Sequence, residues 1–462
     1  MRQTYNLSYI ISITLVATLG GLLFGYDTAV ISGAEKSIEA FLIKPLGLST
    51  FVHGATVSSA LVGCIIGGIL SGFLSNRLGR KRSLSVASIL FFVSALGSGY
   101  PETLFFTYGK PEIGLLLMLN FYRIIGGIGV GLASAVSPMY ISEIAPADIR
   151  GRLVSWNQFA IIFGMLVVYF VNWGIASGQT IEWINSTGWR YMFVSEALPA
   201  GLFVLLIFFV PETPRYLAIV HKEKKALEVL SKIMGNREKA NRILVEIKET
   251  LSEKIKTNIF SYGKTVIVIG ILLTVFQQFV GINVAMYYAP RIFESMGAAK
   301  NASMIQTVFM GFVNVIFTVV AILTVDKWGR RPLLITGSIG MAIGMFAIST
   351  LAFNQVIGIS TLVFIIVYTA SFMMSWGPIC WVLIAEIFPN RIRGQAVAIA
   401  VAAQWAANYL ISSTYPAMME FSGGLTYGFY GLMSVLSALF VWKMVPETKG
   451  KTLEDMNKLW KK

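Results

Sequence analysis

The stretches "SEIAPADIRG" (residues 142–151) and "AEIFPNRIRG" (residues 385–394) are two copies of one pattern, and they decide how the chain is organised. Two further patterns repeat in the same order. "NRLGRKR" (76–82) returns as "DKWGRRP" (326–332), and "PETPR" (211–215) returns as "PETKG" (446–450). The offsets lie between 235 and 250 residues, about half of the 462-residue chain. Three ordered repeats are hard to obtain by chance, so we predict two duplicated halves arranged as a parallel repeat.

The sequence between these motifs is apolar over long distances. Hydrophobic residues make up 55% of the chain and the mean hydropathy is +0.70. Only 13% of the residues are charged, about half the share of a soluble domain. The apolar runs are long enough to span a bilayer, which takes roughly 20 residues. We therefore predict an all-α membrane protein with twelve transmembrane helices. Their predicted limits are 8–33, 51–75, 83–100, 114–138, 151–174, 188–211, 264–296, 302–324, 332–353, 358–386, 394–416 and 425–444.

Basic residues gather in alternate loops, and this pattern explains the net charge of +14 better than a nucleic-acid partner does. Lys and Arg excess marks cytoplasmic loops, so we expect both termini in the cytoplasm. The segment 212–263 mixes charge with Leu and Ile at helical spacing and predicts short amphipathic helices, with a disordered linker as the weaker alternative. The predicted regions are an N-terminal six-helix half (1–211), a cytoplasmic helical linker (212–263) and a C-terminal six-helix half with a short tail (264–462).

The residues that carry enzyme or metal chemistry are sparse. Cys64 and Cys380 lie in apolar runs without a CxxC partner, so we expect neither a disulfide nor a metal site. His53 and His221 are isolated in the sequence. We find no nucleophile–base pair and no phosphate-binding loop. The sequence therefore predicts a protein that is not an enzyme and needs no cofactor.

One carboxylate, Asp27, lies within the first predicted helix, in the run "GGLLFGYDTAV" (20–30). Ionisable groups inside a membrane helix are costly, and they usually mark an ion path, a proton relay or a buried ion pair. At 1.5 Å per residue, Asp27 lies ~10 Å from the outer end of helix 1. Arg123 and Glu196 lie ~13 Å and ~12 Å from the outer ends of helices 4 and 6. We therefore expect the three groups at one depth in the N-terminal half.

Two interpretations fit this cluster. In a proton switch, Asp27 stays ionised beside Arg123 and takes up a proton when it moves into apolar surroundings. In a structural ion pair, Asp27 and Arg123 hold helices 1 and 4 together permanently, without necessarily adding stability. Residue chemistry alone favours neither interpretation.

The repeated "GR[KR][RP]", the paired "E-I-x-P-x-x-I-R-G" and the two "PET" motifs together resemble the sugar porter family of the major facilitator superfamily. "QQFVGIN" (277–283) and "SWGPICWVLIAEIFP" (375–389) strengthen the resemblance, which covers the whole chain. It implies the major facilitator fold, with twelve helices in two six-helix halves and a cytoplasmic helical linker. It also implies the proton-switch interpretation, because proton-coupled members carry an aspartate at the position of Asp27 and facilitators carry an asparagine there.

Amide and aromatic side chains in helices 5, 7, 8, 10 and 11 form a candidate sugar site. Amides donate and accept hydrogen bonds to hydroxyl groups, and aromatic rings pack against the C–H faces of a sugar. The candidates are Gln158, Gln277, Gln278, Asn283, Asn314, Trp381, Gln404 and Trp405. Membrane amides also join helices to one another. Adjacent Gln277 and Gln278 followed by Asn283 are, however, a heavy polar load for packing alone, and the resemblance implies that the matching positions line a sugar.

Three further positions bear on this pocket. The resemblance implies that Phe24 lines it near Asp27 and that Tyr287 forms part of an outer gate. The pentose symporters that the chain resembles carry a glutamine at the position of Met165. Because a thioether does not replace the hydrogen bonds of an amide, this difference leaves the affinity and the preferred sugar open.

Charged residues at the inner helix ends form a predicted cytoplasmic latch. Its members are Glu143, Arg150, Glu212, Arg330, Glu386 and Arg393. Opposite charges repeated on both halves are expected to pair across the halves and close the inside when the outside is open. The alternative is a set of solvated loop charges, since exposed pairs contribute only about 0–1 kcal/mol. The repetition of the motif favours the latch.

These observations predict a proton-coupled importer of a monosaccharide, with D-xylose as the first substrate, acting by alternating access in the bacterial inner membrane. The expected partners are the sugar, the proton and the lipid bilayer, and we expect a functional monomer. The alternatives are an arabinose, galactose or glucose symporter, a sugar uniporter, a drug exporter and a non-transporting sugar receptor. A receptor is disfavoured because only residues 445–462 follow the last helix.

Overall fold

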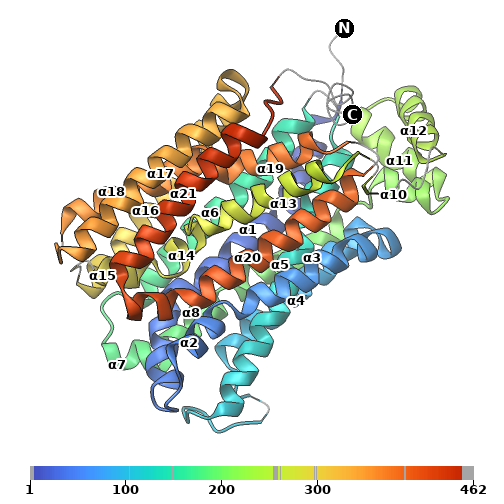
Figure 1. Ribbon diagram of the computed structural model, residues 1–462. Coiled ribbons are helices and arrows are strands. Elements are labelled where there is room, and N and C mark those ends of the chain that lie inside the picture. Colours follow the sequence, from blue (N-terminus) through green and yellow to red (C-terminus); the bar gives the residue numbers. More distant parts are fainter. Residues whose placement is uncertain are drawn as a thin grey trace.

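The chain folds into a helical bundle in a computed structural model (Figure 1). The described residues are 5–103, 105–146, 149–252, 259–260, 262–295, 297, 299–356, 358–389 and 392–449. Within them, 12 helical spans are long and apolar enough to cross a membrane, and this confirms the predicted fold class. Several spans are interrupted, so they contain more than one helix.

The helices divide between the two halves and the segment that joins them. The N-terminal half contains α1 (Leu7–Ile38), η1 (Glu39–Ile43), α2 (Thr50–Val57), α3 (Ser59–Leu78), α4 (Arg80–Gly99), α5 (Ile113–Ile144), α6 (Arg150–Ala176), α7 (Ile181–Trp183), η2 (Ile184–Gly188), α8 (Trp189–Ser195), α9 (Ala197–Leu206) and η3 (Ile207–Phe209). The joining segment contains α10 (Pro214–Ile219), α11 (Glu223–Met234) and α12 (Arg237–Ser252). The C-terminal half contains α13 (Lys264–Phe279), α14 (Ile282–Tyr287), α15 (Ala289–Ser295), α16 (Lys300–Trp328), α17 (Arg330–Phe353), α18 (Ile359–Met374), α19 (Trp376–Ile387), α20 (Arg393–Phe421) and α21 (Gly423–Met444).

The first span runs Leu7–Ile43, ten residues beyond its predicted end at 33. The charged residues Glu35 and Lys36 ended the apolar run in the sequence. The helix nevertheless continues, because Ala34, Ile38 and Leu42 are fully buried against neighbouring elements. Tertiary packing therefore extends this helix past the point where its composition stops being apolar.

Two breaks interrupt the helices of the C-terminal half. Gly281 has φ +90° and separates α13 from α14, a conformation that glycine adopts without a steric penalty. Ser375 (φ −131°, ψ −89°) separates α18 from α19. The break therefore lies one residue before the "WGP" motif (376–378) that predicted it. At each break a backbone carbonyl accepts from a side chain: that of Val280 from Tyr368 (2.8 Å) and that of Trp376 from Gln277 (2.9 Å).

Glycines let α1 and α6 pack at backbone contact. A Cβ atom at Gly25 would lie 1.8 Å from the carbonyl oxygen of Ile161, and one at Gly164 would lie 2.1 Å from that of Leu22. Small residues at helix crossings permit this close approach in membranes. The two helices therefore act as a pair, and both carry residues of the pocket.

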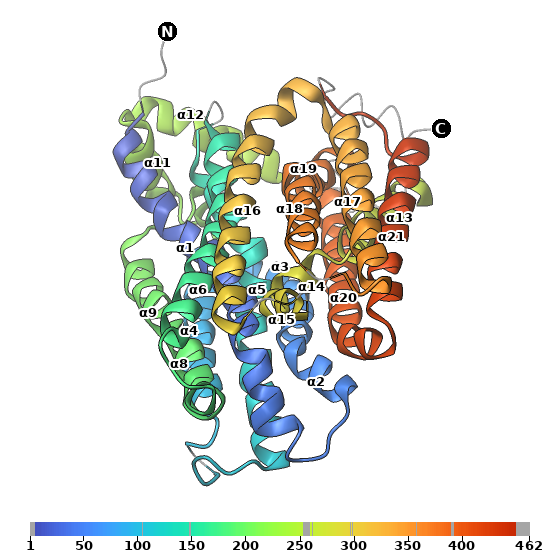
Figure 2. The same cartoon turned by 90° about the vertical axis from the view of Figure 1, so that its left-hand side faces the viewer.

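The segment between the halves forms its own small apolar core. Leu217, Ala226, Leu230, Ala240 and Leu244 pack together across α10, α11 and α12. Figures 1 and 2 show α11 and α12 at the end of the bundle where α1 begins. The backbone N–H of Asn6 donates to the carbonyl of Ile233 (2.8 Å), which ties the start of α1 to α11. The described part of the segment consists mainly of these three helices, as predicted. Residues 253–258 and 261, within the predicted linker, lie outside the described residues.

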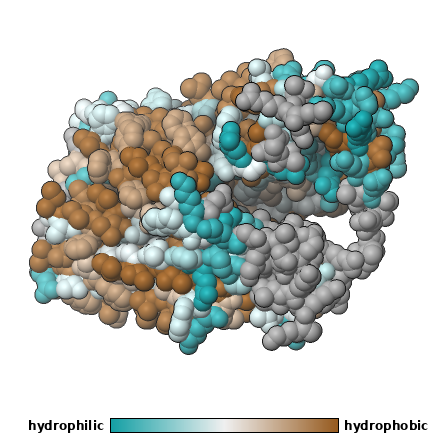
Figure 3. All heavy atoms as spheres, turned by 90° about the horizontal axis from the view of Figure 1, so that it is seen from above, coloured by the Kyte–Doolittle hydropathy of each residue, from teal (hydrophilic) through white to brown (hydrophobic). Residues whose placement is uncertain are grey.

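The flank of the bundle is apolar, as a lipid-facing surface requires. Leu198, Phe209 and Phe421 are each 83% exposed. Figure 3, which shows the view of Figure 1 from above, has hydrophobic atoms over much of its left-hand part. Hydrophilic atoms gather at the right, the side on which Figure 1 places α11 and α12, and in a strip near the middle. The molecule therefore presents a hydrophobic belt and one strongly polar end.

Candidate functional site

Asp27 and Arg123 form an ion pair inside the bundle. Arg123 donates from Nη1 to Oδ1 of Asp27 (3.0 Å) and to its backbone oxygen (3.2 Å). Both residues are almost completely buried. The guanidinium carbon lies 5.3 Å from the ring centroid of Phe193 on α8. The structure thus brings α1, α5 and α8 together around one buried charge pair.

Glu196, at the junction of α8 and α9, completes the predicted charge cluster. It is 1% exposed and lies close enough to Asp27 and Arg123 to interact electrostatically with both. Among the described residues, Oδ2 of Asp27 and Oε1 of Glu196 have no hydrogen-bond donor. Two carboxyl groups therefore face one guanidinium in a dry environment. A single proton held between the two carboxyl groups would balance the cluster.

A pocket opens between the two halves, and Thr28, the residue that follows Asp27 in the sequence, is part of its lining. Eighteen residues line it: Phe24, Thr28, Gln158, Ile161, Ile162, Met165, Gln277, Gln278, Ile282, Asn283, Met286, Tyr287, Phe372, Met373, Gly377, Trp381, Gln404 and Trp405. Seven of the eight predicted sugar residues are among them.

The amides of the pocket form a hydrogen-bonded chain. Gln277 donates to the carbonyl of Trp376 (2.9 Å) at the start of α19, and its Oε1 accepts from Gln404 (2.7 Å). Gln278 donates to Gln277 (3.3 Å) and accepts from Asn283 (2.5 Å). Among the described atoms, Oε1 of Gln404 has no partner. These hydrogen bonds hold the amides in place and leave the Gln404 oxygen able to accept one more.

Aromatic side chains close the pocket on its other sides. Phe24 and Trp405 lie with ring centroids 5.5 Å apart, and Phe24 belongs to the N-terminal half while Trp405 belongs to the C-terminal half. The hydroxyl of Tyr287 accepts from Nδ2 of Asn408 (3.3 Å). Nε1 of Trp405 has no acceptor in the described part of the chain. The pocket therefore combines ring faces with amides, as a sugar requires.

Asn314 is the predicted sugar residue that does not line the pocket. Its Nδ2 donates to Sδ of Met286 (3.4 Å), which itself lines the cavity, so Asn314 lies behind that side chain. Of the apolar lining, the sequence predicted Phe24 and Met165. It missed the rest, because apolar residues are unremarkable in a membrane helix: Ile161, Ile162, Ile282, Met286, Phe372 and Met373. The spacing of Gln158, Ile161, Ile162 and Met165 at helical positions was the available signal.

Comparison with known proteins agrees with this geometry. Residues 13–460 match the family model described as "Sugar (and other) transporter". The chain belongs to this family. It is 54% identical to the D-xylose-proton symporter of Escherichia coli (strain K12), over 100% of this chain and 97% of that protein. It is therefore a transport protein and not an enzyme. It is also a multi-pass protein of the inner membrane.

Solved structures of the xylose transporter XylE from E. coli have the same fold as this sugar transporter. The inward-open conformation superposes with a TM-score of 0.89 at 53% identity, covering 98% of this chain and 100% of that one. The structure of the proton:xylose symporter XylE with bound 6-bromo-6-deoxy-D-glucose gives 0.83 at 52% identity, covering 99% and 100%. The present structure is thus more similar to the inward-open one.

The duplicated motifs of this sugar transporter build the same set of contacts in each half. Arg80 donates to Glu143 (2.8 Å), whose other oxygen accepts from Thr213 (2.6 Å). In the second half, Arg330 donates to Glu386 (2.9 Å), which accepts from Thr448 (2.6 Å). The repeated "GR", "EI" and "PET" patterns therefore meet at one corner of each half.

The glutamate of each "PET" motif caps the helix that follows the "GR" motif. Glu212 accepts from the backbone N–H groups of Arg80 and Lys81 at the start of α4, and Glu447 accepts from those of Arg330 and Arg331 at the start of α17. Burial raises the pKa of Glu212 despite these donors. Burial acts in the same direction on Glu447, but its backbone donors outweigh it and lower the pKa of that carboxyl group.

The predicted cytoplasmic latch has a different arrangement in this conformation. In the contacts described above, Glu143 and Glu212 bond residues of the first set of repeated motifs, and Arg330 and Glu386 bond residues of the second set. Arg150 is exposed and donates to the carbonyl of Ala145 (3.4 Å) in its own loop. The side chain of Arg393 lies outside the described residues. Arg80, which the prediction omitted, is the partner of Glu143. Pairing across the halves stays a prediction for the outward-facing state.

Proposed function

We propose that this protein imports D-xylose together with a proton by alternating access. One observation carries the proposal: a buried Asp–Arg–Glu charge cluster lies directly beside a pocket of amides and aromatic rings. Asp27 belongs to the cluster, and its neighbour Thr28 lines the pocket. The relative that is 54% identical is a D-xylose-proton symporter. The polar lining supports a polyol substrate over the apolar substrates of a drug exporter.

The charge cluster is the proposed proton-coupling site. When Asp27 is ionised, Arg123 neutralises it and holds α1 against α5. When Asp27 takes up an external proton, the attraction to Arg123 weakens and the guanidinium is free to turn to Glu196. The ion pair therefore differs between the loaded and the unloaded carrier, which lets the proton bias the movement of the two halves.

The sugar is proposed to bridge the halves. Gln158, Phe24 and Met165 present one wall from the N-terminal half, and Gln277 and Trp381 present the other. The hydroxyl groups would replace contacts within the amide chain, and ring faces would pack on Trp381 and Trp405. Gln278, Asn283 and Gln404 are proposed as further contacts, Asn314 as a second layer through Met286, and Tyr287 as a gate.

We also propose how the protein is oriented in the membrane and how many chains transport requires. We propose that the end carrying α11 and α12 faces the cytoplasm, with both termini on that side, because the basic loops lie there. The predicted division at 211 and 263 is proposed to separate the moving halves from their linker. Each half contributes one wall of a single pocket, so we propose that one chain suffices for transport.

A panel of labelled sugars tests the proposal. Proteoliposomes with and without an imposed proton gradient would be supplied with xylose, arabinose, glucose or galactose. We expect xylose to accumulate only with the gradient. Arabinose or galactose accumulating in its place would make the protein a symporter of another sugar. Uptake that never exceeds equilibrium would make it a uniporter, and sugar binding without any uptake would make it a receptor.

A further inference from the structure

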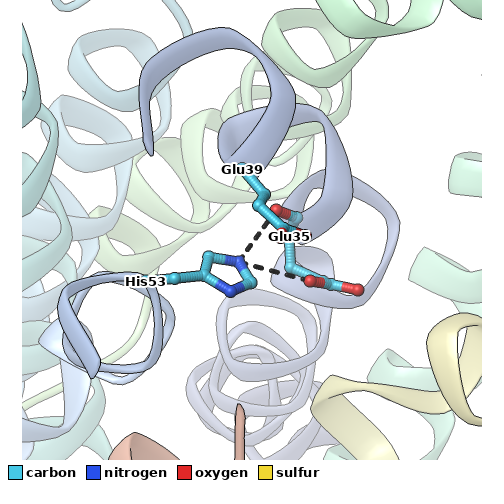
Figure 4. Close-up of side chains that lie close together, drawn as sticks. All are labelled: Glu35, Glu39 and His53. Atoms are coloured by element: carbon cyan, nitrogen blue, oxygen red, sulfur yellow. Dashed lines mark hydrogen bonds and ion pairs between the residues drawn. The ribbon is translucent and has the colours of Figure 1, made fainter. Parts of the chain in front are cut away.

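A second buried charge cluster lies at the opposite end of the bundle from α11 and α12, and the transport site does not use it. Arg291 donates from Nε and Nη2 to the two carboxylate oxygens of Glu35 (2.9 and 2.7 Å), and its Nη2 also bonds Glu39. Glu35 is completely buried although it is charged. His53 lies against the same carboxylate (3.3 Å) and the backbone oxygen of Glu35 (3.1 Å), as Figure 4 shows.

The carboxylates of this cluster and the guanidinium that pairs with them belong to different halves. Glu35 and Glu39 come from α1 and η1 and His53 from α2, all in the N-terminal half. Arg291 comes from α15 in the C-terminal half. A second ion pair beside it, Lys36 with Glu294, also crosses between the halves. Any movement that separates the halves at this end must therefore break both ion pairs.

Packing around the cluster shows that this end of the molecule is closed. A Cβ atom at Gly54 on α2 would lie 2.0 Å from the carbonyl oxygen of Ser413 on α20, so the two halves touch at backbone level. The hydroxyl of Thr50 donates to Glu420 (2.7 Å) across the same junction. The ion pairs thus lie over a continuous contact between the halves.

The cluster has the residue types of a metal site, but the guanidinium of Arg291 takes the position that a metal ion would have. Ligand atoms of Glu35, Glu39 and His53 lie within 4.8 Å of one another. The guanidinium of Arg291 already neutralises both carboxylates with directional hydrogen bonds. The natural cation of this cluster is therefore Arg291, supplied by the other half.

We propose that Arg291, Glu35 and Glu39 form an outer lock, reinforced by Lys36 and Glu294, which holds the outside of the carrier closed. A charge pair that loses one partner leaves an uncompensated charge, so the halves separate here only as water enters to hydrate Glu35. The lock favours the conformation that is closed outside. Glu35 follows Asp27 by eight residues on the same helix, ~12 Å along it. Helix α1 therefore carries both the proposed proton site and the lock.

Accessibility of a cysteine at position 32 tests the lock without any transport measurement. Ser32 on α1 is 4% exposed and faces Pro290 and Met304 of the other half. In Ser32→Cys, a membrane-impermeant maleimide added outside should react slowly. Adding Arg291→Gln should raise the labelling rate roughly tenfold, equivalent to ~1.4 kcal/mol. Arg291→Lys should give a smaller rise. Arg242→Gln, which breaks an exposed pair within α12, is the matched control and should change nothing.

A charge exchange provides the second arm, which remains informative if Arg291→Gln does not fold. Lys36→Glu and Glu294→Lys should each raise the labelling of Ser32→Cys, and the double variant should restore the slow rate. Unchanged labelling in Arg291→Gln, or in both single exchange variants, overturns the lock. Fast labelling that persists in the double variant also overturns the pairing that we propose.

Discussion

Arg123 holds Asp27 through two atoms of that residue, the carboxylate Oδ1 at 3.0 Å and the backbone oxygen at 3.2 Å. The second contact does not depend on the charge of Asp27. Neutralising the carboxyl group would therefore weaken the attachment of α5 to α1 without removing it. Protonation can therefore loosen the pair while α1 and α5 stay in contact, as the proposed switch requires.

The first prediction concerns Asp27→Asn, which keeps the shape and the backbone contact and removes the titrating group. We expect gradient-driven accumulation of sugar to be lost and sugar exchange across the membrane to survive. Uptake and counterflow in the same proteoliposomes measure the two activities. Uphill uptake at the wild-type level would rule Asp27 out as the coupling group.

The second prediction concerns the amide chain and the tryptophan. Gln277→Ala removes contacts to Trp376 and Gln404, and Trp381→Ala removes a ring face. Each lost hydrogen bond should cost about 0.5–1.5 kcal/mol of sugar binding. Binding calorimetry checks the loss, and Gln179→Ala, at an exposed position, is the control. If both pocket variants bind xylose as tightly as the wild type, the site is misplaced.

The third prediction concerns Met165, which lines the pocket opposite the amides and is 8% exposed. Its thioether offers an adaptable apolar surface and few hydrogen bonds. Met165→Gln should tighten xylose binding, by about 0.5–1.5 kcal/mol for one new hydrogen bond. Competition of xylose against glucose and arabinose measures the change in preference. An unchanged affinity would show that position 165 does not contact the sugar, and a weaker affinity would show that the sugar prefers an apolar surface there.

The fourth prediction compares the duplicated corners. Removing one partner of a buried ion pair costs more than removing one partner of an exposed pair. Glu143 is 9% exposed beside Arg80, whereas Glu386 is 31% exposed beside Arg330. Glu143→Ala should therefore lower the thermal stability in detergent more than Glu386→Ala does. An equal or reversed order would mean that these corners are hydrated to the same extent.

The fifth prediction uses the opposite pKa shifts of the two capping glutamates. The lowered pKa of Glu447 means that its stabilisation is present above the unfolded pKa, near 4.3, and is lost as the pH falls. The raised pKa of Glu212 means that stability falls as that group ionises. Glu447→Gln should therefore destabilise the protein at pH 7 more than Glu212→Gln does. Unfolding midpoints at pH 7 measured for both variants check the order.

Much of this architecture was predictable because membrane helices can be recognised in a sequence by the length and hydrophobicity of their segments. The twelve spans, the buried charge cluster and seven of the eight predicted sugar residues follow from hydropathy, rise per residue, residue chemistry and the family resemblance. The failures have physical causes. The extension of α1 depends on tertiary burial of Ala34 and Ile38, and the position of Asn314 behind Met286 depends on helix rotation. The outer lock joins residues 256 positions apart, for which the sequence offers no local pattern.

The corners built from Glu143 and Glu386 have a consequence for the origin of the molecule. The hydrogen bonds described for each corner join residues of one set of repeated motifs, and the same pattern is formed twice. A single ancestral copy could therefore have folded this corner alone and paired with a second copy of itself. The linker through α10, α11 and α12 would then be a later addition, which made the association of two separate chains intramolecular.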